Sequence, residues 1–201
     1  MPKSYSEKER QHLIELLQEA AFESIKKNGI KKTTVDDLVK KVNIPKGTFY
    51  LLYKSKELLL FDAIMKKEDA LHQKMATKMT SLAADFSVTS LTDLFFDFFQ
   101  LGFEMGILPI ILNGELGLLI RKLPDDLVSD SISKDDEFLM MLSHLFPQMH
   151  EQEIKTFSSA FRALFLTAMY KREIGDYDDA LKLLIRGLVI QMLEEKNDSI
   201  K

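Results

Sequence analysis

The sequence of 201 residues contains no cysteine, which excludes a disulfide framework and any metal site built on thiolates. It also lacks a long apolar run: the most apolar stretch, residues 105–120, is interrupted by Pro109, Asn113 and Glu115 and is too short to span a bilayer. The first ten residues are polar and contain no apolar core of a signal peptide. We therefore expect a cytoplasmic protein that has no membrane partner.

Motifs that are typical of enzymes are missing as well. The four histidines, His12, His72, His144 and His150, are scattered and form no HExxH pair. There is no glycine-rich phosphate loop, no GxSxG turn and no group of carboxylates with the spacing of metal ligands. The sequence therefore predicts neither catalysis, nor a metal site, nor a cofactor.

Charge of either sign is abundant, but it is unevenly distributed. Residues 1–56 contain 12 Lys and Arg against 7 Asp and Glu, whereas residues 57–201 contain 15 against 24. A basic N-terminal part on an acidic remainder directs one end of the molecule toward phosphates and lets the rest repel them. Lysines at a solvated terminus are also common without any such role, so this asymmetry is only a first indication of nucleic-acid binding.

Apolar residues recur at intervals of three and four along nearly the whole chain, which predicts an all-α fold. Thr34 has the position of a helix N-cap with Asp37 three residues later, and Thr89 or Ser90 is expected to cap a phenylalanine-rich helix. The stretch 124–134, rich in Asp and Ser, is expected to be a mobile loop. The expected helices span approximately residues 6–27, 34–42, 46–52, 56–78, 91–106, 151–173 and 177–195.

The second and third of these helices are short and are separated by the break Asn43-Ile44-Pro45, an arrangement typical of a helix-turn-helix. The third helix begins with Lys46, Gly47 and Thr48, where free backbone N–H groups and the helix dipole favour anions. Phe49 and Leu52 are expected to face inward. Tyr50, Leu51 and Tyr53 are expected to stay nearer the surface.

Three segments, residues 34–39, 45–50 and 53–59, together resemble the N-terminal DNA-binding domain of the TetR family of bacterial repressors. The resemblance covers about residues 10–65. It implies a three-helix DNA-binding domain at residues 1–56, a fourth helix from about residue 56 that links the domains, and a larger helical effector-binding and dimerisation domain at 57–201. It further implies groove or base contacts from Lys46, Gly47, Thr48 and Leu51. It implies phosphate contacts from Thr34, Tyr50, Tyr53, Lys54 and Lys56.

The segment departs from the family pattern at three places. Asn43 replaces the usual glycine, and this change is tolerated because asparagine can also adopt the left-handed conformation. Pro45 replaces the usual Ser or Thr and removes a side-chain cap. Leu51 and Leu52 stand where many members have a polar or aromatic reader such as His, and Leu51 can offer only apolar contact, for instance to a thymine methyl group. For Tyr50 and Tyr53 the alternative is that they only pack the small domain.

The central part of the chain is rich in Phe and Met, residue types that line many small-molecule sites. The resemblance implies an effector pocket among the central helices. Such a stripe more often forms a core, and charged residues among apolar neighbours more often cap or pair than bind a ligand. The candidate pocket residues are Phe99, Phe103, Glu115, Arg121, Met141, Phe161 and Phe165.

The last two helices are apolar over too wide an arc to be buried against one neighbour only. A second copy of the chain would cover the remaining side, and the resemblance implies the same homodimer. The candidate interface residues are Leu181, Leu184, Leu188 and Met192.

These observations predict a ligand-responsive transcriptional repressor that binds a palindromic operator in double-stranded DNA as a homodimer. A small apolar or aromatic effector would release it from DNA. The alternative is an α-helical sensor of small molecules or lipids whose helix-turn-helix is vestigial or binds protein. A DNA-shift assay with the upstream region of the protein's own gene distinguishes the two.

Overall fold

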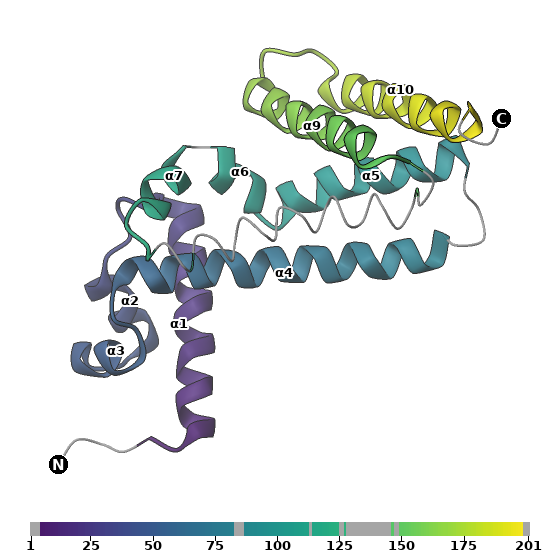
Figure 1. Ribbon diagram of the computed structural model, residues 1–201. Coiled ribbons are helices and arrows are strands. Elements are labelled where there is room, and N and C mark those ends of the chain that lie inside the picture. Colours follow the sequence, from purple (N-terminus) through teal and green to yellow (C-terminus); the bar gives the residue numbers. More distant parts are fainter. Residues whose placement is uncertain are drawn as a thin grey trace. The chain divides into compact units, whose positions relative to one another are not determined.

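The structure is a computed structural model that describes residues 5–82, 87–112, 114–124, 127, 146 and 149–198. Within these residues the secondary structure is entirely helical, as the sequence predicts (Figure 1). The chain forms two compact units. The first comprises Met1–Ala70 together with Met105–Pro124, and the second comprises Leu71–Glu104 together with Asp125–Lys201. We refer to them as the head and the body.

The head begins with three helices: α1 (Glu7–Asn28), α2 (Val35–Val42) and α3 (Lys46–Leu52). Ser6 caps α1 in a capping box with Glu9, which satisfies two backbone N–H groups at the start of the helix. The Thr34 side chain accepts a hydrogen bond from the backbone N–H of Asp37, so the predicted cap of α2 is confirmed. The extent of α3 is also confirmed.

The turn between α2 and α3 has the geometry that the sequence suggests. Asn43 adopts a left-handed conformation with φ of 56°, and the N–H of Ile44 bonds back to the carbonyl of Val39. Pro45 provides no side-chain cap, but its carbonyl accepts the N–H of Thr48. Apolar side chains of α1, α2, α3 and α4 form the core of the head. Its fully buried members include Leu17, Phe22, Leu38, Phe49 and Leu60.

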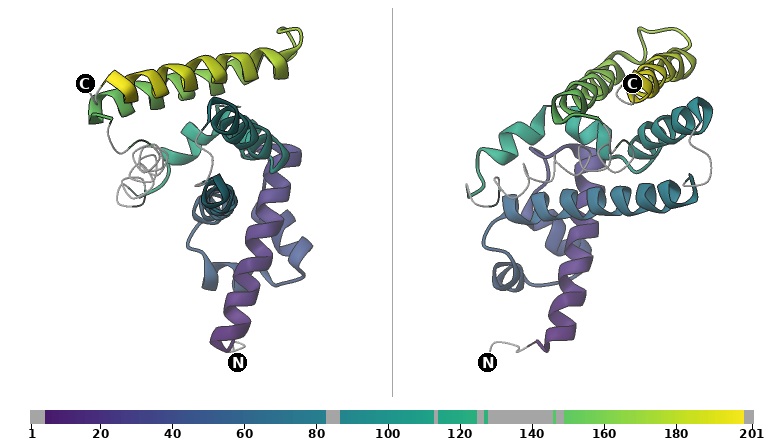
Figure 2. Two further views of the ribbon diagram at one scale, coloured as in Figure 1. Left: turned by 90° about the vertical axis from the view of Figure 1, so that its right-hand side faces the viewer. Right: turned by 45° about the vertical axis from the view of Figure 1, so that its right-hand side comes forward.

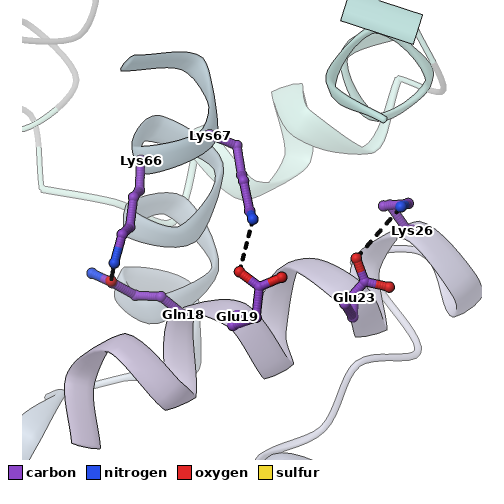
Figure 3. Close-up of polar contacts among 6 residues, drawn as sticks. All are labelled: Gln18, Glu19, Glu23, Lys26, Lys66 and Lys67. Carbon is purple, nitrogen blue, oxygen red and sulfur yellow. Dashed lines mark hydrogen bonds and ion pairs between the residues drawn. The ribbon is translucent and has the colours of Figure 1, made fainter. Parts of the chain in front are cut away.

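Helix α4 (Lys56–Leu82) belongs to the head up to Ala70 and to the body from Leu71. Ser55 accepts the N–H of Leu58 and so caps it. Polar contacts join α4 to α1: Lys66 donates to Gln18 at 2.7 Å and Lys67 pairs with Glu19 at 2.7 Å (Figure 3).

Two further short helices, α6 (Ile107–Leu112) and α7 (Glu115–Ile120), also belong to the head. They come more than thirty residues after its other helices in sequence, and α6 packs against α1. Ile107, Ile110 and Leu119 are buried there. The head is therefore not a single continuous stretch of chain.

The body contains α5 (Val88–Glu104), α9 (Glu151–Thr167), the 3-10 turn η1 (Ala168–Tyr170) and α10 (Tyr177–Asp198). Helix α10 packs against α5 and α9, and both views of Figure 2 show α9 and α10 side by side. Phenylalanine side chains of α5 and α9 form much of its core.

Two expectations about helix ends in the body are corrected. Helix α5 begins at Val88, and its cap is Ser87, which accepts the N–H of Ser90, so Thr89 and Ser90 lie inside the helix. Helix α9 ends at Thr167, where the chain tightens into η1, and does not continue to Glu173. Apart from Pro124 and Leu127, the expected loop at 124–134 lies outside the described residues.

Candidate nucleic-acid interface

Helix α3 exposes two large side chains, those of Tyr50 and Leu51. Phe49 is completely buried, whereas Tyr50 is 53% exposed and Leu51 is 60% exposed. The Phe49 and Tyr50 rings meet edge to face, with centroids 5.1 Å apart, so the buried ring supports the exposed one. One side of the short helix is fixed in the core, and the other presents a rigid surface to solvent.

The N-terminal turn of α3 is accessible. Gly47 is exposed, and no atom lies within 4 Å of the place where a Cβ would stand, so another molecule can approach its backbone closely. Lys46 is also exposed and forms an ion pair with Asp36 of α2, with the nitrogen and oxygen 2.8 Å apart. The hydrogen bond and charge of Asp36 raise the pKa of Lys46, which keeps its ammonium group protonated.

Thr48, the remaining residue of this turn, lies below the surface. Its side chain is 7% exposed, and its hydroxyl is 3.4 Å from the hydroxyl of Tyr5. Tyr5 therefore lies beside the surface of α3, although sequence reasoning did not single it out. No local signal identifies it, because the contact joins residues 43 positions apart.

Tyr53 points into the head. Its hydroxyl donates to Asp62 of α4 at 2.5 Å, and the Gln18 side chain of α1 donates to the same carboxylate at 2.7 Å. Burial, together with the hydrogen bond and charge of Asp62, raises the pKa of Tyr53 above its ordinary value. Sequence reasoning missed Gln18 and Asp62. A signal was present: Gln18 is a polar residue within the apolar stripe of α1.

The other predicted DNA contacts are Thr34, Lys54 and Lys56. Thr34 is exposed, and Lys54 is exposed in the turn before α4. Lys56 is half-buried and donates to the backbone carbonyl of Thr33 at 2.9 Å. The head thus presents Thr34, Lys46, Gly47, Tyr50, Leu51 and Lys54 to solvent. It holds Thr48, Tyr53 and Lys56 through internal contacts.

The candidate pocket residues fall into two groups. Phe99 stacks on Phe165 with centroids 4.2 Å apart, Phe161 lies 4.5 Å from Phe95, and all four belong to the body. Phe103 is half-buried beneath the ammonium group of Lys171. Glu115 and Arg121 belong to the head. Met141 lies outside the described residues.

Glu115 has an internal role in the head. One oxygen of its carboxylate accepts the backbone N–H of Ile30 at 2.5 Å and that of Lys31 at 3.3 Å. Arg121 is exposed at the end of α7. Of the two readings that the sequence allows for Glu115, the geometry agrees with capping of backbone groups.

The body also has an open groove of about 280 Å³ between α5 and α10. Polar and charged side chains dominate its lining, and Lys182 and Asp93 form an ion pair across it at 2.7 Å. None of the candidate pocket residues lines this groove. Its lining residues are Thr89, Thr92, Asp93, Asp179, Lys182, Leu183 and Arg186.

The four candidate dimer residues of α10 differ in exposure. Leu181 is 2% exposed and Met192 is 1% exposed, because α10 turns this side toward the interior of the body. Leu184 is 51% exposed and Leu188 is half-buried. The helix is apolar nearly all round, so its pattern alone did not separate the inner side from the outer. Other exposed apolar residues nearby in sequence are Leu166, Tyr170, Leu183 and Ile190.

The described residues contain neither a metal-binding cluster nor a membrane-spanning helix. No three His, Asp or Glu side chains there gather closely enough to hold a metal ion. No helix in that part of the chain combines the length and apolar character needed to cross a membrane.

A family model described as bacterial regulatory proteins of the TetR family matches residues 17–63, from the middle of α1 into α4. The N-terminal part of the chain is therefore similar to the DNA-binding domain of the TetR family. It follows that α2 and α3 are the helix-turn-helix of a DNA-binding transcription regulator. Regulators of this family act as dimers and are not enzymes.

Solved structures resemble this chain over nearly its whole length. A protein from Mesorhizobium loti MAFF303099 assigned as a TetR-family transcriptional regulator has a TM-score of 0.69 at 15% identity, covering 92% of this chain and 96% of its own. The fatty acid degradation regulator FadR from Bacillus halodurans has a TM-score of 0.63 at 17% identity, covering 93% and 97%. A Clostridium perfringens protein assigned as a fatty acid metabolism regulator has a TM-score of 0.57 at 20% identity, covering 90% and 97%. These likenesses show a shared fold. A comparison with curated proteins finds no match.

Proposed function

We propose that the protein is a repressor that binds a palindromic DNA operator as a homodimer and is released by a small, largely apolar effector. The exposed side of α3 is the observation that carries the proposal. A seven-residue helix is anchored by Phe49 and presents Tyr50, Leu51 and the open backbone of Gly47 to solvent. This is the form of a recognition helix, which reads the major groove with its exposed side.

Within this proposal the nine candidate DNA residues have different tasks. Lys46 and Gly47 approach the groove, and Tyr50 and Lys54 bind phosphates. Leu51 contacts a thymine methyl group. Thr34 binds a phosphate at the start of α2, and Tyr53 acts indirectly by fixing the end of α3. Lys56 binds a phosphate while it keeps the Thr33 carbonyl, because its ammonium group has three donors, and Thr48 reaches DNA only if its contact with Tyr5 is exchanged.

The proposed effector site lies among the phenylalanines of α5 and α9. The stacked Phe99–Phe165 pair and the Phe95–Phe161 pair are apolar surfaces that aromatic or aliphatic ligands bind well. Two structures of similar fold are named as regulators of fatty acid degradation and fatty acid metabolism, which supports an apolar effector. For the dimer we propose the outer side of α10, with Leu183, Leu184 and Ile190 at its centre.

The test is DNA binding by the purified protein to the upstream region of its own gene. Lys46→Ala and Lys54→Ala each remove a cation, so affinity for all DNA sequences should fall. The slope of log affinity against log salt should become shallower by roughly 1 to 2 per dimer. Lys155→Ala, an exposed lysine of α9, is the matched control and should leave both quantities unchanged.

Asp36 offers a variant with the opposite sign. Its carboxylate holds the Lys46 ammonium and repels phosphate, so Asp36→Asn should raise DNA affinity several-fold. If the wild-type protein binds no DNA and neither the lysine variants nor Asp36→Asn change this, the repressor proposal is wrong. The alternative of a small-molecule sensor would then stand.

A further inference from the structure

The connection between α1 and α2, residues 29–34, receives a carboxylate from a distant part of the chain. Glu115, the first residue of α7, accepts the consecutive backbone N–H groups of Ile30 and Lys31 with one oxygen. Consecutive N–H groups that point to one side form a concave anion site, which a carboxylate fills well. The donors and the acceptor are 85 and 84 positions apart.

The backbone is shaped to admit this carboxylate. Gly29 has a φ of 82°, which side chains other than glycine rarely adopt. A Cβ at Gly29 would lie 2.8 Å from the bonded oxygen of Glu115, closer than real contacts allow. Both properties make glycine the residue that fits here, so the close approach of Glu115 is built into the connection.

Two of the candidate DNA contacts depend on the same connection: Thr34 is part of it, and Lys56 is hydrogen-bonded to it. The Thr33 carbonyl accepts the ammonium group of Lys56, and the Thr33 hydroxyl, itself buried, donates to the carbonyl of Gly29. The next residue, Thr34, is the cap of α2. A displacement of the connection therefore moves the start of α2 and the anchor of Lys56 together.

We infer that Glu115 is a positioning residue for DNA binding, which acts by fixing the connection between α1 and α2. Glu115 works through the backbone amides of Ile30 and Lys31. The inference rests on the proposed DNA-binding function. It assigns α7 to the DNA-binding machinery, although α7 follows the first body helix in sequence.

The experiment compares Glu115→Ala and Glu115→Gln with the wild type and with a matched control. Glu104→Gln makes the same change at an exposed carboxylate at the end of α5 and should behave as wild type. Glu115→Ala should weaken DNA binding on the order of tenfold and make the salt slope shallower by about 1 per subunit, as loss of one phosphate contact does. Glu115→Gln keeps an oxygen acceptor and should recover part of the affinity.

Two readouts separate positioning from mere stability. A loss of stability lowers the active fraction but leaves the salt slope of the folded protein unchanged, whereas a displaced Lys56 changes the slope. In the Glu115→Ala background, Lys56→Ala should then add little further loss. Folded Glu115→Ala protein with wild-type affinity and slope would overturn the inference.

Amide hydrogen exchange keeps the inference testable if Glu115→Ala does not fold. The Ile30 and Lys31 amides should be protected in the wild type and should exchange at least tenfold faster in Glu115→Gln, while the core amides of α1 are unchanged. Equal exchange in both proteins would contradict the positioning role. A wild-type protein that binds no DNA would refute the proposed function instead, and the exchange result would still decide whether Glu115 fixes the connection.

Discussion

In the head, polar side chains join residues that are far apart in sequence, whereas in the body phenylalanine rings from different helices stack on one another. Gln18, Tyr53 and Asp62 form a hydrogen-bonded cluster in the head, and Glu115 binds amides 85 and 84 positions away. The body has the stacked Phe99–Phe165 pair at 4.2 Å and the Phe95–Phe161 pair at 4.5 Å.

This difference has a physical consequence for each unit. Hydrogen bonds weaken steeply when their angle or length changes, so a network of them holds a surface in one geometry. Apolar contacts are much less directional, and cores accept changes of shape if total volume is kept. The head is thus built to present a fixed surface. The contacts that hold the body depend less on exact geometry.

The largest effect should come from the ring contacts of the body. Phe161 is completely buried against Phe95, and Phe161→Ala should lower the free energy of unfolding by about 3–5 kcal/mol because it leaves a cavity. Chemical denaturation measures this. Leu166→Ala, on the same helix but 60% exposed, is the control and should cost less than about 1 kcal/mol. Equal losses of unfolding free energy in the two variants would contradict the packing of Phe161 in an aromatic core.

A smaller effect is expected in the polar cluster of the head. Tyr53→Phe removes one partly buried hydrogen bond to Asp62 and should lower the free energy of unfolding by about 1–2 kcal/mol at neutral pH. Tyr50→Phe, at a half-exposed ring, is the control and should change it by less than about 0.5 kcal/mol.

The Tyr53 contribution should also depend on pH. Because the folded-state pKa of Tyr53 is raised above 10.0, its contribution is complete below that pH and is lost as the pH rises through the folded-state pKa. The stability difference between wild type and Tyr53→Phe should therefore be constant from pH 7 to 9 and shrink at higher pH. A difference that grows above pH 10 would contradict this assignment.

The smallest effect should come from the surface pair that joins α1 and α4. Lys67 and Glu19 are 2.7 Å apart but partly exposed, with 28% and 58% of their side chains accessible (Figure 3). A double-mutant cycle with Lys67→Ala and Glu19→Ala should give a coupling energy of about 0.2–1 kcal/mol that decreases in high salt. A coupling energy above about 2 kcal/mol would mean that this surface ion pair stabilises the fold as much as the cluster of Gln18, Tyr53 and Asp62 does.

Local features of the fold could be predicted from the sequence because their causes lie within a few residues. Thr34 caps α2 through Asp37, three positions away, and Asn43 takes the left-handed turn itself. The start of α5 was misplaced for a similar reason. Ser87, Thr89 and Ser90 are all plausible caps, and only the actual hydrogen bond from Ser90 to Ser87 decides between them.

Contacts between distant residues could not be predicted in the same way. Nothing near Glu115 in sequence indicates that its partners are Ile30 and Lys31, so its position among apolar residues suggested a pocket instead. Likewise, α10 carries apolar residues on every side, and only its packing against α5 distinguishes Leu181 from Leu184. Periodicity identifies a helix with two apolar sides but not which side its own domain takes.

The head is built from two separate stretches of chain, which limits where the protein can be truncated. A fragment that ends after Ala70 would lack residues 105–124, and with them the acceptor for two backbone amides and the buried side chains of Ile107, Ile110 and Leu119. An isolated DNA-binding module cut from the N-terminus would therefore be frayed and prone to aggregate. Chimeras that transfer the helix-turn-helix into another regulator should include α6 and α7, or should provide another carboxylate that accepts the N–H of Ile30.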